Sequence, residues 1–167
     1  MKQSGRKGVA VVVCIVLVLA VVAAWFATGD LRLYFSGQLM LRSGQYEQAE
    51  QVFLQLSGYR DADALLQQAQ YGVACKLQKN GQLSEAARQF TALGDYRDSQ
   101  EQAASCFYEL GTQWRLTKQY EKAYACYQDA GAYRDAPTQC QRMLYTLGHE
   151  AFLQEYQCGS VPYRRLS

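Results

Sequence analysis

The sequence predicts an all-α protein in which a short array of helical hairpins follows an apolar membrane helix. Two observations predict it: an uncharged apolar run near the amino terminus, and an internal repeat with a constant period of 37 residues. The tripeptide Tyr-Arg-Asp occurs at 59–61, 96–98 and 133–135, hereafter the Tyr-Arg-Asp turns. A catalytic motif is normally needed once, whereas a unit that must stack on its neighbours is needed several times.

The apolar run extends from Val9 to Ala27 without a charged residue. At about 1.5 Å per residue it spans roughly 28 Å as a helix, close to the hydrocarbon thickness of a bilayer. Trp25 and Phe26 stand at its far end, where aromatic rings favour the headgroup region. We therefore predict a basic head at 1–7 and a transmembrane helix at 8–28.

A cleaved signal peptide is the main competing interpretation, since Val22-Ala23-Ala24 resembles a cleavage site. The apolar run is longer than the roughly 7–15 residues of a signal core, which favours an uncleaved anchor. Lipid attachment at Cys14 is disfavoured because the residue before it is Val13. A buried core helix would need a much larger protein around it.

Basic residues predict the orientation of the anchor. Lys2, Arg6 and Lys7 precede it, and the positive-inside tendency places them in the cytoplasm and the repeats outside. The rest of the chain is nearly neutral, with 14 Lys and Arg against 15 Asp and Glu once these three are set aside. Without a basic face, nucleic acid is not an expected partner.

Aligning the chain on itself with the 37-residue shift brings similar residues into columns without gaps. The first, the tyrosine column, holds Tyr34, Tyr71, Tyr108 and Tyr145. The second, the small-residue column, holds Gly37, Ala74, Gly111 and Gly148. Further columns are Ala49, Ala86 and Ala123, then Phe53, Phe90 and Tyr127, and finally the turns with Tyr59, Asp61, Tyr96, Asp98, Tyr133 and Asp135. These residues are expected to hold the repeat together.

Each unit is predicted to contain two helices. The aspartate of each Tyr-Arg-Asp turn stands where the N-cap of the next helix is wanted. Gly44 and Gly81 stand where the first helix of a unit ends, because glycine tolerates a left-handed residue there. The predicted repeat domain is 30–157, with units near 30–60, 61–97 and 98–134 and a capping helix at 135–157; 158–167 is predicted to be a flexible tail.

The second helices resemble those of the tetratricopeptide repeat family. "GQYEQAEQVFLQL", "GQLSEAARQFTAL" and "KQYEKAYACYQDA" follow the family's Gly-x-Tyr-x-x-Ala-x-x-x-Phe-x-x-Leu pattern. The unit is 37 residues rather than the usual 34, and Tyr-Arg-Asp replaces the usual proline. The chain is similar to a variant tetratricopeptide solenoid of the kind found in bacterial membrane-anchored proteins.

The resemblance implies a concave groove lined by the first helices. Tyrosines supply apolar area and a hydroxyl, a combination suited to holding a peptide. The tyrosine column could equally form part of the core, and both interpretations stay open. Some members of the family bind carboxylate tails with Lys, Arg and Asn at groove positions. The corresponding positions of this sequence do not match that set. The candidate groove residues are Tyr34, Gln38, Leu41, Tyr71, Cys75, Gln78, Tyr108, Thr112, Arg115, Tyr145, His149 and Phe152.

Residues for catalysis, cofactor binding or metal binding are not predicted. The single histidine, His149, has no regularly spaced partners, and no Gly-rich phosphate loop or Cys-x-x-Cys pair occurs. The five cysteines beyond Cys14 are expected to be small buried hydrophobes, although an outside location would permit disulfides. We expect a non-enzymatic, membrane-tethered scaffold that binds a protein or peptide; the alternatives are a structural spacer and a cysteine-based redox regulator.

Overall fold

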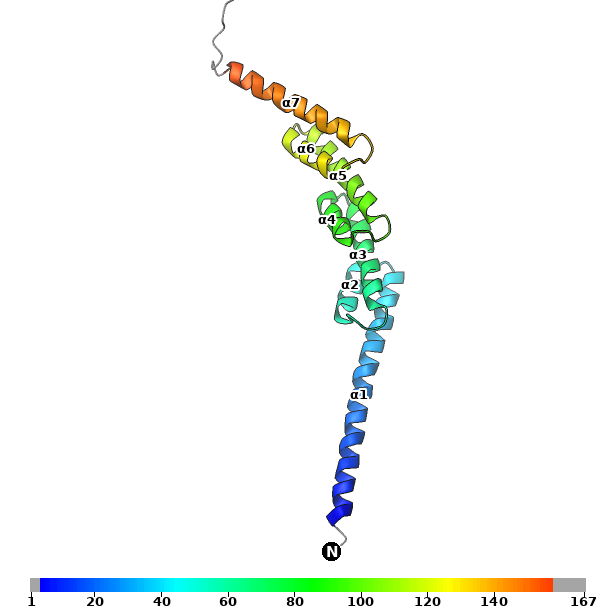
Figure 1. Ribbon diagram of the computed structural model, residues 1–167. Coiled ribbons are helices and arrows are strands. Elements are labelled where there is room, and N and C mark those ends of the chain that lie inside the picture. Colours follow the sequence, from blue (N-terminus) through cyan, green and yellow to red (C-terminus); the bar gives the residue numbers. More distant parts are fainter. Residues whose placement is uncertain (1–3, 158–167) are drawn as a thin grey trace, which may run out of the picture. The chain divides into compact units, whose positions relative to one another are not determined.

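The computed structural model describes the backbone of residues 4–157 and the side chains of 14–22, 24 and 29–154. Over this part of the chain all regular structure is helical. The order is α1 (Ser4–Arg42), α2 (Tyr46–Gln55), α3 (Ala62–Lys79), α4 (Leu83–Leu93), α5 (Ser99–Leu116), α6 (Tyr120–Asp129) and α7 (Ala136–Gln157) (Figure 1). The all-α prediction is confirmed.

Helix α1 is continuous for 39 residues, so the predicted boundary near Gly29 is not a break in the helix. Nothing lies within 4 Å of a Cβ placed on Gly29. A glycine costs a helix about 1 kcal/mol relative to alanine, and α1 continues through Gly29 in spite of this cost. Only the carboxyl-terminal part of α1 lies beside α2 (Figure 1).

The tail predicted at 158–167 and residues 1–3 of the head predicted at 1–7 lie outside the described residues, and of residues 4–7 only the backbone is described. The predicted membrane helix at 8–28 lies within α1, but most of its side chains, including those of Trp25 and Phe26, are not described. Among the described residues, no helix is both long enough and apolar enough to cross a membrane.

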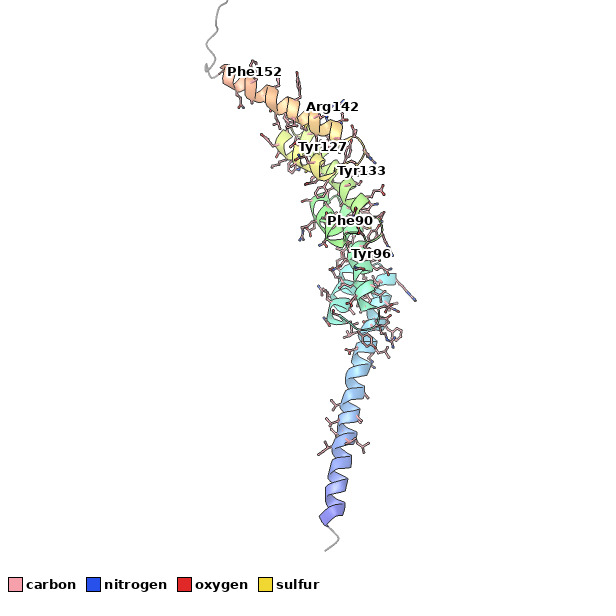
Figure 2. The ribbon with its side chains drawn as sticks, viewed as in Figure 1. Phe90, Tyr96, Tyr127, Tyr133, Arg142 and Phe152 are labelled. Carbon is pink, nitrogen blue, oxygen red and sulfur yellow. The ribbon has the colours of Figure 1, made fainter. Side chains whose placement is uncertain are left out.

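The chain divides into two compact units, 1–70 and 71–167, with the division inside α3. In the first unit, a core cluster joins α1, α2 and the start of α3 around the fully buried Phe53 and Ala49. In the second unit, Phe90 is the buried ring of one cluster and Tyr127 that of the next. Each ring comes from the same column of the repeat. Figure 2 shows Phe90 on α4 and Tyr127 on α6.

The hairpin turns use a left-handed residue where each first helix ends. Gly44 and Gly81 have φ of 76° and 77°, as the sequence predicted. The third copy places Lys118 at this position, with φ of 59°. A side chain in this region is strained by about 1–2 kcal/mol relative to glycine.

Candidate functional site

The tyrosine column is joined to the Tyr-Arg-Asp turns by a hydrogen bond that recurs in all three hairpins. The tyrosine hydroxyl donates to the aspartate carboxylate 27 residues later in the chain. The oxygen–oxygen distance is 2.6 Å for Tyr71 with Asp98 and for Tyr108 with Asp135, and Tyr34 donates to Asp61 in the same way. Each bond ties the first helix of a hairpin to the turn that closes it.

The arginine of each turn lies against two tyrosine rings. The Arg97 guanidinium is 5.2 Å from the centroid of Tyr71 and 5.2 Å from that of Tyr96. Such contacts contribute about 0.5–1 kcal/mol each at exposed sites. Arg60 and Arg134 lie in the same way over the corresponding rings. All three arginines have a positive φ, between 50° and 52°, so the stacking holds a backbone conformation that arginine rarely adopts.

Two further rings complete each contact. The tyrosine that opens the turn meets the column tyrosine edge-on, with centroids 5.9 Å apart in each of the three hairpins. The aromatic residue of the second helix also meets this ring edge-on, with centroids 5.7 Å apart for Phe90 and 5.5 Å apart for Tyr127. Both distances suit favourable edge-to-face pairs. The Tyr-Arg-Asp turn therefore has a structural role in these hairpins, because it packs against the column tyrosine.

The side chain of Asp98 does not cap the following helix as the sequence suggested. Asp98 occupies the N-cap position of α5 but makes no side-chain capping hydrogen bond. One oxygen of its carboxylate accepts from Tyr71, and the other accepts from the side chain of Gln102 at 2.9 Å. A carboxylate has two oxygens, and both are engaged by neighbours outside the cap.

These hydrogen bonds shift the pKa values of both partners. The bond from Tyr71 is the main cause that lowers the pKa of Asp98, and the bond from Tyr108 does the same for Asp135. In return, the carboxylates raise the pKa of Tyr71 and Tyr108, with burial as a second cause. A hydrogen bond to the charged carboxylate favours its ionised form, and the neutral hydroxyl must be kept to make it.

Two members of the small-residue column make room for the aromatic ring. A Cβ on Gly37 would lie 2.7 Å from the ring of Phe53, and one on Gly111 would lie 3.0 Å from that of Tyr127. Ala74 takes this place in the middle hairpin and is fully buried. Gly148, the last member, has nothing within 4 Å of its Cβ position.

Most of the predicted groove residues on α1, α3 and α5 are engaged within the chain. Leu41 is buried, while Cys75, Gln78, Thr112 and Arg115 are half-buried. Gln38 donates to the Tyr34 hydroxyl at 2.9 Å, and Thr112 lies 3.1 Å from the hydroxyl of Tyr127.

The predicted residues on α7 are exposed. Tyr145 is 77% exposed and stacks on the ring of His149, with centroids 6.4 Å apart. Phe152 is 59% exposed. Figure 2 shows Phe152 and Arg142 on this helix. Tyr145 is thus the one member of the tyrosine column that no Tyr-Arg-Asp turn covers in the described part of the chain.

A pocket of about 550 Å³ adjoins Tyr145. Arg115 from α5, Tyr120 from α6, and Arg142 and Tyr145 from α7 are among its lining residues. The Nε of Arg115 is buried, and no acceptor for it is found in the described part of the chain. Sequence reasoning placed Arg115 and Tyr145 in a groove but missed Arg142, which stands at no repeated column. The rest of the lining consists of Thr, Gln and Met side chains, without an acid.

The described cysteines form no disulfide. Cys106 is fully buried, and burial raises the pKa of its thiol to about 11. Burial also raises the pKa of Cys126 and Cys140. Among the side chains that the structure describes, no cluster of His, Cys, Asp and Glu could hold a metal ion.

Comparison with known protein families, with curated proteins and with solved structures finds no match to this chain.

Proposed function

We propose that this chain is a membrane-anchored, non-enzymatic scaffold that binds a protein or peptide. The observation that carries the proposal is the contrast between Tyr145 and the rest of its column. Three column tyrosines are held by a Tyr-Arg-Asp turn, whereas Tyr145 presents its ring and hydroxyl to solvent beside an arginine-lined pocket. An exposed tyrosine beside arginine is the composition that protein interfaces favour.

We further propose that the hairpins form a short solenoid similar to that of tetratricopeptide repeats. The recurrence of the same tyrosine–aspartate bond and the same ring contacts supports this, because equal units with equal joints are what a solenoid requires. Within the second unit, the predicted groove residues that are exposed lie on α7, namely Tyr145, His149 and Phe152.

The anchor is proposed to be the transmembrane helix predicted at 8–28, with the amino terminus cytoplasmic and the repeats outside. Support comes from the described apolar residues between Ile15 and Val22. Their large side chains are 45–69% exposed, and a helix apolar on its whole surface is costly in water. Extraction of the full chain from membranes by detergent but not by alkaline carbonate would agree with the anchor. Release by carbonate would contradict it.

A structural spacer without a ligand groove is the second candidate. Tyr34 is only 6% exposed, and the tyrosines of α3 and α5 are half-buried in intramolecular contacts, which favours a role in the joints. A spacer needs no partner on its surface.

The two candidates are separated by crosslinking the full chain in native membranes and purifying the adducts under denaturing conditions. The scaffold predicts one or a few proteins enriched over a control that carries only residues 1–28. A spacer predicts the same background from both. Absence of any enriched protein would remove the scaffold proposal.

A further inference from the structure

We propose that the exposed face of α7 around Tyr145 is the docking site for an amphipathic helix of a partner protein, followed by a turn that presents a carboxylate to the Tyr145 hydroxyl. This deepens the proposed scaffold function and rests on it. The partner is expected to carry an aromatic residue that faces Gly148 and an aspartate or glutamate in the turn.

The chain itself supplies the template for this occupant. In each hairpin, the column tyrosine is covered by a helix with an aromatic residue and by an aspartate eight positions after that residue, such as Phe90 and Asp98 over Tyr71. Tyr145 has the same small residue three positions later as Tyr34 and Tyr108 have, namely glycine. The receiving half of the contact is therefore present on α7 and its covering half is not found among the described residues.

Space for an aromatic ring is also present. In the preceding hairpin, the ring of Tyr127 approaches the Cβ position of Gly111 to 3.0 Å, so this column accepts a ring in close contact. Among the described residues, no heavy atom outside the adjoining helix backbone lies within 4 Å of the corresponding position at Gly148. An apolar ring that fills this space would remove water from the Tyr145 face. The binding is stabilised by about 25 cal/mol for each Å² of apolar surface that is buried.

The charge of the pocket favours a carboxylate in the turn of the partner. The pocket beside Tyr145 contains Arg115 and Arg142, and none of its lining residues is acidic. The charge of Arg142 also helps to lower the pKa of Asp135. That carboxylate already accepts hydrogen bonds from the Tyr108 hydroxyl and, at 2.8 Å, from the side-chain amide of Gln139. A carboxylate brought into the pocket beside Tyr145 would enter a lining that holds two arginines, and the buried Nε of Arg115 lacks an acceptor that such a group can supply.

The test uses the full chain in detergent micelles and a synthetic peptide with the sequence of residues 83–98, which covers Tyr71 within the chain. Binding is measured by fluorescence anisotropy for this peptide and for its Asp98→Asn form. We expect the first to bind saturably below about 1 mM. Hydrogen bonds to charged groups are the stronger class, so the second is expected to bind about tenfold or more weakly.

Protein variants locate the site. Tyr145→Phe and Arg142→Gln are each expected to weaken binding of the acidic peptide by about fivefold or more, because each removes one contact to the carboxylate. Arg42→Gln, at an exposed arginine of the other unit, is the matched control and should leave binding unchanged. The Asp98→Asn comparison needs no change in the protein, so it remains decisive if a variant fails to fold.

Several results would overturn the proposal. These are no binding of the acidic peptide, equal binding of both peptides, and equal binding by Tyr145→Phe and the unaltered chain. Self-association that is lost in Tyr145→Phe would assign the face to a second copy instead. Capture of a partner in membranes together with no peptide binding would overturn this site alone and leave the scaffold function standing, whereas failure of both would overturn both.

Discussion

The hydroxyl of Tyr71 donates a hydrogen bond to the carboxylate of Asp98, 27 residues away, at 2.6 Å. The same bond joins Tyr108 to Asp135 at the same distance. It connects a helix to the turn that closes its hairpin, and it explains why the Tyr-Arg-Asp tripeptide recurs.

Removing the Tyr71–Asp98 bond is expected to destabilise the second unit measurably. Tyr71→Phe and Asp98→Ala should each lower the free energy of unfolding by about 1–2 kcal/mol, because a hydrogen bond to a charged group is lost at a partly exposed position. The double variant should lose less than the sum, with a coupling of about 1 kcal/mol. Urea unfolding of the full chain in detergent, followed by helical circular dichroism, measures all four forms.

Tyr145→Phe is the matched control for this cycle, since no hydrogen-bond partner of the Tyr145 hydroxyl is found among the described residues. Its stability should equal that of the unaltered chain within about 0.5 kcal/mol, as for most surface changes. Strict additivity of Tyr71→Phe and Asp98→Ala would contradict the bond.

Stability should also depend on pH at both ends of the range. The folded pKa of Asp98 and Asp135 lies below the ordinary value of about 3.9, so their contribution is present above that value and is lost as pH falls through the folded pKa. The folded pKa of Tyr71 and Tyr108 lies above about 10, so their contribution is present below pH 10 and is lost as pH rises through the folded pKa.

Urea midpoints measured between pH 2 and 7 test the acid side. The unaltered chain should lose stability steeply below about pH 4, since the unfolded chain then binds more protons than the folded one. The Tyr71→Phe, Tyr108→Phe double variant should show a flatter dependence. Identical slopes for the two proteins would show that these bonds do not govern the acid response.

Alanine substitution in the small-residue column should change the stability of the fold in different directions at two positions of the second unit. Gly111→Ala places a Cβ 3.0 Å from the Tyr127 ring and should destabilise by about 1–3 kcal/mol, as overpacking commonly does. Gly148→Ala meets no neighbour within 4 Å and should be neutral or stabilising by up to about 1 kcal/mol through helix propensity. Thermal melts of the two variants compare them directly, and a stabilising Gly111→Ala would rule out the close ring contact.

Glycine substitution should distinguish two residues that share a left-handed backbone. Lys118→Gly relieves the strain at φ 59° and should stabilise the chain by about 0.5–1 kcal/mol. Arg97→Gly relieves similar strain but loses the contacts of the guanidinium with two rings, so no gain is expected. Unfolding free energies of both variants are compared with the unaltered chain, and equal gains would mean that the arginine stacking contributes nothing.

Cys106 is expected to resist alkylation in the folded chain. The thiolate is the reactive form, and burial raises the pKa of this thiol to about 11, so little thiolate exists at pH 7.5. Mass spectrometry after brief iodoacetamide treatment should find Cys106 unmodified, and modified when the same treatment is given in urea. Rapid labelling in the folded chain, prevented by an oxidant, would favour the redox regulator instead.

The period of 37 residues was sufficient to predict the hairpins, because each column falls on the same face of its helix in every copy. It was also sufficient to infer a structural role for the Tyr-Arg-Asp turns. The partners within the contact were not predicted. Columns show which positions are equivalent but not which of them meet, so the aspartate was assigned to a helix cap that its side chain does not make.

A signal for the missed contact did exist in the sequence. Each tyrosine of the column from Tyr34 to Tyr108 has an aspartate 27 residues later. Arg97 lies over two rings with a positive φ, a backbone conformation that no residue preference predicts for arginine. Arg142 was missed for another reason: it belongs to no repeated column, and it lines the same pocket as Arg115 only through the packing of α5, α6 and α7.

The most direct test of the binding scaffold places a photoreactive benzoylphenylalanine on the exposed face of α7, at position 149, in the full chain in native membranes. The same residue at position 54, exposed on α2, is the control. We predict a discrete protein adduct from position 149 that is lost when Tyr145→Phe is added, and no such adduct from position 54. Equal adducts from both positions, or none from position 149, would contradict the account.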